Sequence, residues 1–199
     1  MSAAAHRRAV ELAHACRLIN HGPTVLVSAL HDGRRNVMAA AWSMPVEFTP
    51  PRVAVVIDKS TYTRELVLAS GCFALSIPCR AQADLVTTVG RTSGRDIAAP
   101  DDKFARHEIE AFDGPALGLP LVVGCVAWME CRLIPERHTE AAYDTFFAEV
   151  VSAQADVRVF AAGRWSFDAG NTPLHTLHHL GGGSYGVIGD VVQGSVLRP

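Results

Sequence analysis

Residues 24–58 have the sequence TVLVSALHDGRRNVMAAAWSMPVEFTPPRVAVVID, which gives the clearest indication of the fold class. It contains three apolar runs rich in strand-forming residues, and turn-forming residues separate them. The tetrapeptide His31-Asp32-Gly33-Arg34 has the composition of a hairpin turn, and Pro50-Pro51 breaks the chain before the third run. The pattern therefore predicts strands over residues 24–30, 36–43 and 52–57.

The rest of the chain continues with short strands and a few helices. Residues 1–20 have an amphipathic helical pattern, and we expect further helices over 61–69, where Gly71 is a stop signal, and over 81–89. Further strands are expected over residues 72–77, 121–134 (one long strand or a bulged pair), 146–153 and 157–164. A mainly antiparallel β-barrel with helices fits this order better than a doubly wound parallel sheet, which needs a helix after nearly every strand. Because no repeat or linker divides the sequence, we expect a single domain over residues 1–199, with 1–20 as an N-terminal helical segment.

Composition excludes several classes of protein. Among 199 residues, 49% are hydrophobic and 19% are charged, which excludes a disordered chain. The formal net charge of −2 argues against a nucleic-acid partner. The longest apolar stretch, residues 119–129, is shorter than the ~20 residues that a membrane span needs, and no signal peptide pattern opens the chain, so we expect no membrane partner and a cytoplasmic location. The five cysteines include no CxxC pair and indicate neither a disulfide framework nor a zinc site.

One candidate anion site follows the third apolar run. In VAVVIDKSTYTREL, residues 53–66, a buried strand is followed by Lys59, Ser60, Thr61 and Thr63 at the start of a helix. Free backbone N–H groups, hydroxyls and an ammonium group at a helix N-terminus suit a phosphate. The alternative is that Ser60 or Thr61 only caps the helix and that Lys59 is solvated. Lysine is rare here, since the 18 basic residues include only Lys59 and Lys103.

Three other segments are candidates for ligand contact. Three consecutive alanines in NVMAAAWSMPV, residues 36–46, leave room for a flat group near the backbone, or else reflect tight strand packing. Residues 90–96, GRTSGRD, combine glycines, hydroxyls and cations in a predicted loop, which suits a polar ligand or is only a solvated surface. In HTLHH, residues 175–179, the histidines do not form a convincing metal site, because His178 and His179 point apart on a strand. We therefore expect no metal.

Taken in order, these motifs resemble the flavin reductase-like domain, specifically the flavoredoxin-type FMN-binding split barrels. The similarity rests on residues 36–46, 50–66, 70–78 (SGCFALSIP), 89–96 and the DKF of 102–104. GCVAWMECRLI (124–134), YDTFFAEVV (143–151), GRWSF (163–167) and LHHLGGGSYGVIGD (177–190) are similar to the same group. The resemblance spans about residues 20–190. It implies a six-stranded split β-barrel and a homodimer that holds FMN near the subunit interface.

The resemblance also implies roles for individual residues. Asn36, Ala39, Ala40 and Trp42 would approach the isoalloxazine ring or the ribityl chain, and Lys59, Ser60, Thr61 and Thr63 would hold the phosphate. Lys103 would reach the flavin or its phosphate, Phe167 would lie close to the cofactor, and His178 would contact the nicotinamide or the flavin edge. No catalytic residue is implied, because the cofactor carries the chemistry.

Two functions follow from the resemblance. The first is an oxidoreductase that takes hydride from NAD(P)H onto FMN and passes electrons to a flavin, metal or protein acceptor. The second is an FMN-binding electron carrier that a partner protein reduces, without direct nicotinamide binding. A non-flavin interaction module, in which the alanine and glycine surfaces are only close packing, is a third and more remote interpretation.

Overall fold

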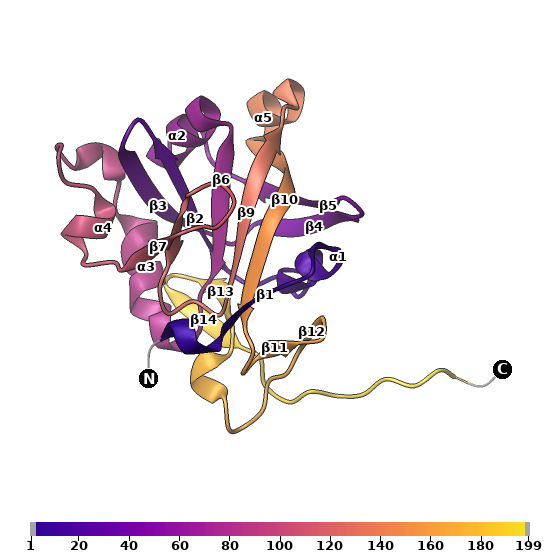
Figure 1. Ribbon diagram of the computed structural model, residues 1–199. Coiled ribbons are helices and arrows are strands. Elements are labelled where there is room, and N and C mark those ends of the chain that lie inside the picture. Colours follow the sequence, from indigo (N-terminus) through magenta and orange to yellow (C-terminus); the bar gives the residue numbers. More distant parts are fainter. Residues whose placement is uncertain (1–2, 198–199) are drawn as a thin grey trace.

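The computed structural model describes residues 3–197, and its centre is one strongly curved antiparallel sheet (Figure 1). Seven strands follow each other in the order β3-β2-β6-β9-β10-β5-β4, and β1 adds to β10 beyond this path. Every pairing in this sheet is antiparallel. The strands are β1 (Arg7–Ala9), β2 (Val25–His31), β3 (Arg34–Ala40), β4 (Ser43–Phe48), β5 (Pro51–Val56), β6 (Cys72–Ile77), β9 (Ala127–Ile134) and β10 (Thr145–Asp156).

The two ends of the strand path are joined by the chain itself. β3 and β4 occupy opposite ends of the hydrogen-bonded order, yet only Ala41 and Trp42 separate them in sequence. The sheet must therefore curl until the end of β3 reaches the start of β4, as in a barrel that stays open along one seam. Within residues 3–197, β3 pairs only with β2 and β4 only with β5, so both strands have an unpaired edge at this seam.

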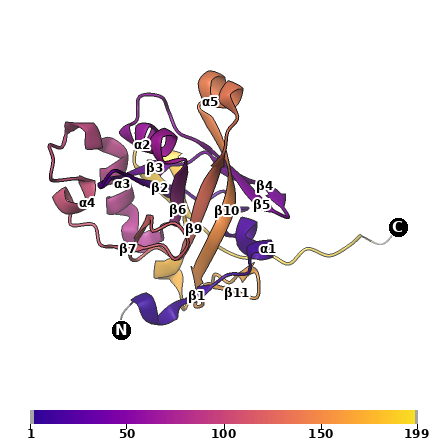
Figure 2. The ribbon, with the colours of Figure 1, turned by 45° about the horizontal axis from the view of Figure 1, so that its top comes forward.

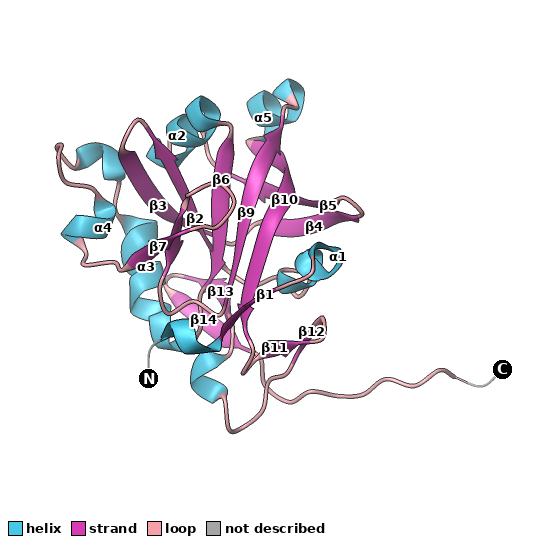
Figure 3. Ribbon diagram, in the orientation of Figure 1, coloured by secondary structure: helices cyan, strands magenta, loops and turns pink. Residues whose placement is uncertain are grey.

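Helices and three small hairpins surround the sheet (Figures 2 and 3). α3 and α4 lie beside β3, α2 lies near the same strand, and α5 stands at one end of β9 and β10 (Figure 1). The α-helices are α1 (Leu12–Ala15), α2 (Tyr62–Ser70), α3 (Ala83–Arg91), α4 (Lys103–Arg106) and α5 (Arg137–Tyr143). Short 3-10 helices span Ala3–His6, Cys16–Leu18, Arg80–Gln82, Gly94–Asp96 and Thr172–Leu174. The hairpins pair β7 (Ala111–Asp113) with β8 (Pro120–Val122), β11 (Phe160–Ala161) with β12 (Arg164–Trp165), and β13 (Leu177–Gly181) with β14 (Ser184–Val187).

Both faces of the sheet are buried, which explains the near-continuous apolar runs of the sequence. On β2, Val25 and Val27 belong to the core inside the curve of the sheet, whereas Leu26 belongs to a second cluster on the outer face. Phe104 of α4 and Val89 of α3 cover that outer cluster. Alternating side chains of one strand therefore fill two cores, as the period of two requires.

The mainly β expectation and several local predictions are confirmed. The hairpin turn at Asp32 and Gly33 has φ values of 47° and 74°, the left-handed conformation that this type of turn requires. α2 begins after Thr61, whose hydroxyl accepts a hydrogen bond from the Arg64 N–H at 3.4 Å, and it ends at Gly71, which has φ of 70°. The strand predicted over residues 72–77 is β6.

Other predictions need correction. The expected number of six strands is too low, since the main sheet has eight, including the edge strand β4, of which the predicted strand over 36–43 covered only Ser43. The N-terminal helical pattern is interrupted, because β1 leaves the helical path to pair with β10 and only short helical turns flank it. The predicted run over 121–134 is two strands, β8 and β9, and the run over 157–164 is the β11–β12 hairpin. The number and the bounds of these strands depend on which segments pair with each other, and a local sequence pattern does not contain that information.

A buried carboxylate on the central strand β9 organises a neighbouring loop. Glu130 is fully buried, and its carboxylate accepts backbone N–H donors from Ala116 at 2.8 Å, Leu117 at 2.7 Å and Leu119 at 3.5 Å. A Cβ atom at Gly114 would lie 2.2 Å from this carboxylate, so the loop can pass there only with glycine. Such bonds are charge-assisted, and each buried donor is left unpaired when the acceptor is lost.

We therefore expect Glu130→Gln to lower the free energy of unfolding by about 2–3 kcal/mol, because the amide group replaces one acceptor oxygen with a donor. Urea denaturation followed by circular dichroism measures this change. Glu108→Gln is the matched control, since Glu108 is exposed. Equal stability of the two variants would show that the Glu130 bonds do not hold the loop.

Candidate functional site

Two adjoining cavities lie along β3, where the sheet is open. The first, which we call the hydroxyl cavity, has a volume of about 270 Å³, and the second, the alanine cavity, has about 240 Å³. Ala39, Gly90 and Arg91 line both, so the two form neighbouring parts of one groove between β3 and α3. Together they reach the size of a pocket for a cofactor-sized ligand.

The floor of the hydroxyl cavity contains an unsatisfied buried amide. Asn36 is buried on β3, and its Nδ2 donates to Thr63 Oγ1 at 2.8 Å. Its Oδ1 is buried and has no hydrogen-bond partner among the described residues. A Cβ atom at Gly94 would lie 2.2 Å from this oxygen, so only glycine permits the loop to pack there. An unpaired buried acceptor costs free energy that a ligand donor would recover.

The N-terminus of α2 forms one wall of the hydroxyl cavity. Ser60, Thr61, Tyr62 and Thr63 line it, and three of them, Ser60, Thr61 and Thr63, are the residues expected to hold a phosphate. The Ser60 hydroxyl donates to Asp58 Oδ1 at 2.5 Å, and this hydrogen bond lowers the pKa of the exposed Asp58 carboxyl. At the start of α2 the Thr61 N–H donates to Asp58 O and the Arg64 N–H to Thr61 Oγ1, so the N–H groups of Tyr62 and Thr63, which have no partner among the described residues, are the ones available to an anion.

Lys103 brings a buried cation to the same cavity. It belongs to α4 and is only 2% exposed, and its Nζ donates to the carbonyl oxygens of Val37 at 3.0 Å and Val89 at 2.8 Å. An ammonium group has three donors, so one remains for a ligand. Burial without a carboxylate partner lowers the pKa of Lys103 to about 8. A bound anion would compensate this desolvation.

The loop after α3 completes the hydroxyl cavity. Thr92, Ser93 and Gly94 line it, and Arg95 fixes the loop by donating to Ser60 O at 3.1 Å and pairing with Glu65. Arg91 has no carboxylate partner in the described chain, and its Nη2 makes only a long contact with Gly182 O at 3.5 Å.

The alanine cavity has an apolar floor and a polar rim. Ala39, Ala40 and Ala41 form the floor, while Thr24 Oγ1 is buried at its side without a partner among residues 3–197. The β13–β14 hairpin closes the opposite side with His179 and Tyr185, and Tyr185 Oη lies 3.1 Å from Thr87 Oγ1 of α3. This arrangement can accept a flat group on the alanine floor and offer it hydrogen bonds at the edges.

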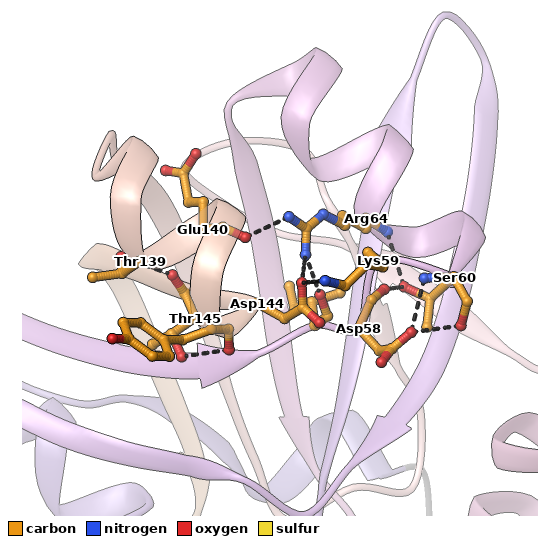
Figure 4. A network of polar contacts seen from close by, with 11 residues as sticks. Asp58, Lys59, Ser60, Arg64, Thr139, Glu140, Asp144 and Thr145 are labelled. Atoms are coloured by element: carbon orange, nitrogen blue, oxygen red, sulfur yellow. Dashed lines mark hydrogen bonds and ion pairs between the residues drawn. The ribbon is translucent and has the colours of Figure 1, made fainter.

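Some predicted residues do not line either cavity. Lys59 is exposed, and its Nζ points to Asp144 at 3.8 Å, where Arg64 also binds at 2.6 Å (Figure 4). Trp42 is 75% exposed at the start of the β3–β4 seam. Phe167 stacks on Trp165 with ring centroids 5.2 Å apart, and His178 packs against His21, so both belong to a separate aromatic cluster. The prediction that His178 and His179 point apart is confirmed, and it is His179 that reaches the alanine cavity.

The structure thus groups Asn36, Ala39, Ala40, Ser60, Thr61, Thr63 and Lys103 at one groove. Arg91, Ser93 and Gly94 also line the groove. They are not among the individually predicted contacts, although the composition of the loop over 90–96 indicates a polar ligand. The predicted contacts also omitted Thr24, His179 and Tyr185, for which no local signal exists, because tertiary packing alone brings the C-terminal hairpin to α3.

Other chemistry is limited in the part of the chain that the structure describes. No group of three His, Cys, Asp or Glu side chains there is placed to hold a metal ion. All five cysteines are unpaired, and all but Cys72 are buried. Between residues 3 and 197, no helix is long and apolar enough to span a membrane.

Comparisons with known proteins agree with this fold. The pattern of the family described as "Flavin reductase like domain" matches residues 17–167. The chain is 55% identical over 179 residues to the uncharacterized protein YddH of Escherichia coli, which covers 88% of this chain and 92% of that protein. The structure of an FMN-binding domain of a flavin reductase-like enzyme from Shewanella baltica superposes with a TM-score of 0.90 at 45% identity, over 95% of this chain and 97% of that one. Flavoredoxin of Desulfovibrio vulgaris superposes with a TM-score of 0.72 at 25% identity, over 87% and 90% of the two chains. On this similarity and on its split-barrel-like sheet, the chain belongs to the flavin reductase-like domain family.

Proposed function

We propose that the groove along β3 binds FMN and that the protein is an oxidoreductase of the flavin reductase type. The main support is that Lys103, buried without a carboxylate partner, and Asn36, whose Oδ1 is unsatisfied, line one cavity that adjoins an apolar alanine floor. One end of the groove suits an anion and the other a flat ring. FMN has both in one molecule, and the relative from Shewanella baltica is an FMN-binding domain.

The residues present fit this cofactor in detail. Lys103, Arg91, Ser93 and the α2 N-terminus supply donors for the phosphate in the hydroxyl cavity. Asn36 Oδ1 would accept from a ribityl hydroxyl or a ring N–H, and the Thr24 hydroxyl would bond at the ring edge. Ala39 and Ala40 have no side chain beyond Cβ, so a ring can approach the strand.

The protein's part in the reaction is to bind and orient. When bound, FMN supplies the hydride and electron chemistry, which we propose runs from NAD(P)H onto the flavin and then to a flavin, metal or protein acceptor. The groove walls would fix the orientation of the ring, and the alanine floor would exclude water from one of its faces. No side chain of the groove is assigned a proton-transfer role.

A flavin electron carrier is the second candidate, favoured by the similarity to flavoredoxin of Desulfovibrio vulgaris. Anaerobic mixing of the FMN-loaded protein with NADH, and separately with NADPH, distinguishes the two through the flavin's visible absorbance. Bleaching by either nicotinamide supports the reductase and identifies the donor. If the flavin colour persists with both nicotinamides and bleaches only with a reduced protein partner, the protein is an electron carrier and not a reductase.

We further propose that a second copy of the chain covers the edge strand β4. Trp42, Met44, Val46 and Phe48 alternate along the seam and are 75%, 58%, 46% and 61% exposed. An unpaired edge strand with an apolar stripe is a strong candidate for association between chains. Trp42 directly follows the alanine floor in sequence, so this interface would lie beside the proposed flavin.

The phosphate assignment predicts unequal roles for the two lysines. Lys103→Met should weaken FMN binding by about 10- to 100-fold, since a charge-assisted bond in a buried site is lost. Lys59→Met should change it less than threefold, because Lys59 is exposed and faces Asp144. Fluorescence titration of FMN measures both affinities. A larger loss of FMN affinity in Lys59→Met than in Lys103→Met would contradict this assignment and would place the phosphate at Lys59, as the sequence motif suggests.

The lowered pKa of Lys103 predicts a pH dependence of binding. The phosphate dianion favours the charged lysine, so FMN affinity should fall as pH rises through the free-protein pKa of about 8. Between pH 7 and 9.5 we expect a loss of at least about fivefold in the wild type. The Lys103→Met protein should show a flat profile over this range, and a parallel decline in both proteins would assign the effect to another group.

The proposed interface predicts a change in oligomeric state. Phe48→Asp should convert a dimer to a monomer in sedimentation velocity, because a charge on the apolar stripe cannot be buried without a partner. Leu68→Asp on α2 is the control, since Leu68 is a comparably exposed apolar residue outside the stripe. A wild-type monomer at all concentrations, or a dimer that survives Phe48→Asp, would contradict the β4 interface.

A further inference from the structure

The start of α2, which we assign to the flavin phosphate, is fixed by a side chain that does not line the groove. Arg64 Nη1 donates to Asp144 Oδ1 at 2.6 Å and to the Ile57 carbonyl oxygen at 2.9 Å (Figure 4). Its Nη2 donates to the Glu140 carbonyl oxygen at 2.5 Å, and the guanidinium carbon lies 4.9 Å from the ring centroid of Phe146. Arg64 therefore joins α2 to the end of β5, to α5 and to β10 at one point.

Asp144 completes this junction. It ends α5 in a left-handed conformation with φ of 52°, and its N–H donates to the Thr139 carbonyl oxygen. Its own carbonyl oxygen accepts the Ile57 N–H at 2.9 Å, so Ile57 is bonded to Asp144 through its N–H and to Arg64 through its carbonyl oxygen. The side chains of Arg64 and Asp144 are only 12% and 14% exposed, so salt screens their ion pair weakly.

Neither member of this pair lines the hydroxyl cavity or the alanine cavity, but the residues that precede Arg64 in the chain do. Tyr62 and Thr63 line the hydroxyl cavity, and their N–H groups are the ones available to an anion. Because Arg64 belongs to the same helical turn, its bonds to Ile57 and Asp144 determine where these two N–H groups lie. Hydrogen bonds weaken steeply when a donor moves or turns, so a small displacement of this turn is sufficient to weaken anion binding.

We propose that Arg64 and Asp144 are a positioning pair for the phosphate of the flavin. This inference rests on the proposed function, in which the hydroxyl cavity holds that phosphate. Asp144 fixes the guanidinium group of Arg64, and Arg64 fixes the first turn of α2 against the end of β5. The N–H groups of Tyr62 and Thr63 are thereby held beside the hydroxyl cavity. The pair acts on the phosphate only through the backbone of α2.

Charge alone predicts the opposite effect of removing the Asp144 carboxylate. A negative charge near a phosphate lowers its affinity, and Lys59, whose Nζ lies 3.8 Å from Asp144, would lose its partner and become free for an anion. Neutralising Asp144 would then strengthen FMN binding. Positioning predicts weaker FMN binding, because an amide oxygen holds the guanidinium group of Arg64 less strongly than a carboxylate does. The sign of the change therefore distinguishes the two explanations.

Calorimetric titration of the full-length protein with FMN and with riboflavin tests the proposal. In Asp144→Asn we expect FMN affinity to fall at least about fivefold, while riboflavin affinity stays within about twofold of wild type. Asparagine tolerates the left-handed conformation of residue 144, so the backbone is kept. Arg64→Lys should give the same selective loss, because a lysine keeps the charge but lacks the fork that reaches several acceptors.

Glu140→Gln is the matched control. It removes one negative charge from the same segment, yet the bond to Arg64 is kept, since Arg64 donates to the backbone carbonyl oxygen of Glu140 and not to its side chain. We expect both flavin affinities of this variant to stay within about twofold of wild type. A loss of FMN affinity equal to that of Asp144→Asn would assign the effect to charge in this region and would overturn the pair.

The remaining outcomes separate this proposal from the one on which it rests. A wild type that binds no FMN, or that binds FMN and riboflavin equally, overturns the phosphate site and the pair together. A wild type that prefers FMN, with an Asp144→Asn protein that binds FMN as tightly or more tightly, overturns the pair alone. Equal losses of FMN and riboflavin affinity in Asp144→Asn and Arg64→Lys also overturn it, because they would show a general structural role.

Discussion

The open seam where β3 leads into β4 determines how the main sheet curves. Two strands at opposite ends of a seven-strand path are linked by only Ala41 and Trp42, so the sheet has to curl until the end of β3 reaches the start of β4. Neither strand completes its hydrogen bonding at the seam within residues 3–197. On the β3 side, helices α2, α3 and α4 enclose the groove. On the β4 side, an apolar stripe remains exposed. A single topological feature thus creates both the candidate site and the candidate interface.

The groove contains polar groups that the fold alone does not satisfy. Asn36 Oδ1 and Thr24 Oγ1 are buried without partners in the described chain, and Lys103 is buried against two carbonyl oxygens instead of a carboxylate. The buried carboxylates of Glu130 and Asp156, by contrast, are satisfied, the first by three N–H donors and the second by Arg158. Unsatisfied polar groups raise the free energy of the empty site, and a ligand that supplies the missing partners binds more tightly for that reason.

Sequence reasoning predicted the local elements and half of the groove. The Asp32-Gly33 turn, the capped α2 and the strand β6 depend on near neighbours in the chain, and each was predictable. Ser60, Thr61 and Asn36 were also predictable, because their residue types and positions match a known family pattern. The direction of Lys59, away from the groove and toward Asp144, depends on α5, which the sequence pattern did not reveal. Tyr185 and His179 reach the groove only through the packing of a C-terminal hairpin on α3, a contact 98 residues apart in the chain in the case of Tyr185 and Thr87.

We propose that the groove recognises a flavin by its phosphate as well as by its ring. Calorimetric titration of the wild-type protein with FMN and with riboflavin tests it most directly, because the two ligands differ only in that phosphate. We predict one bound FMN per chain and an affinity for riboflavin that is weaker by at least about 30-fold, as expected when charge-assisted bonds to Lys103 and the α2 N-terminus are absent. Equal affinities for the two ligands, or no binding of FMN, would contradict the account.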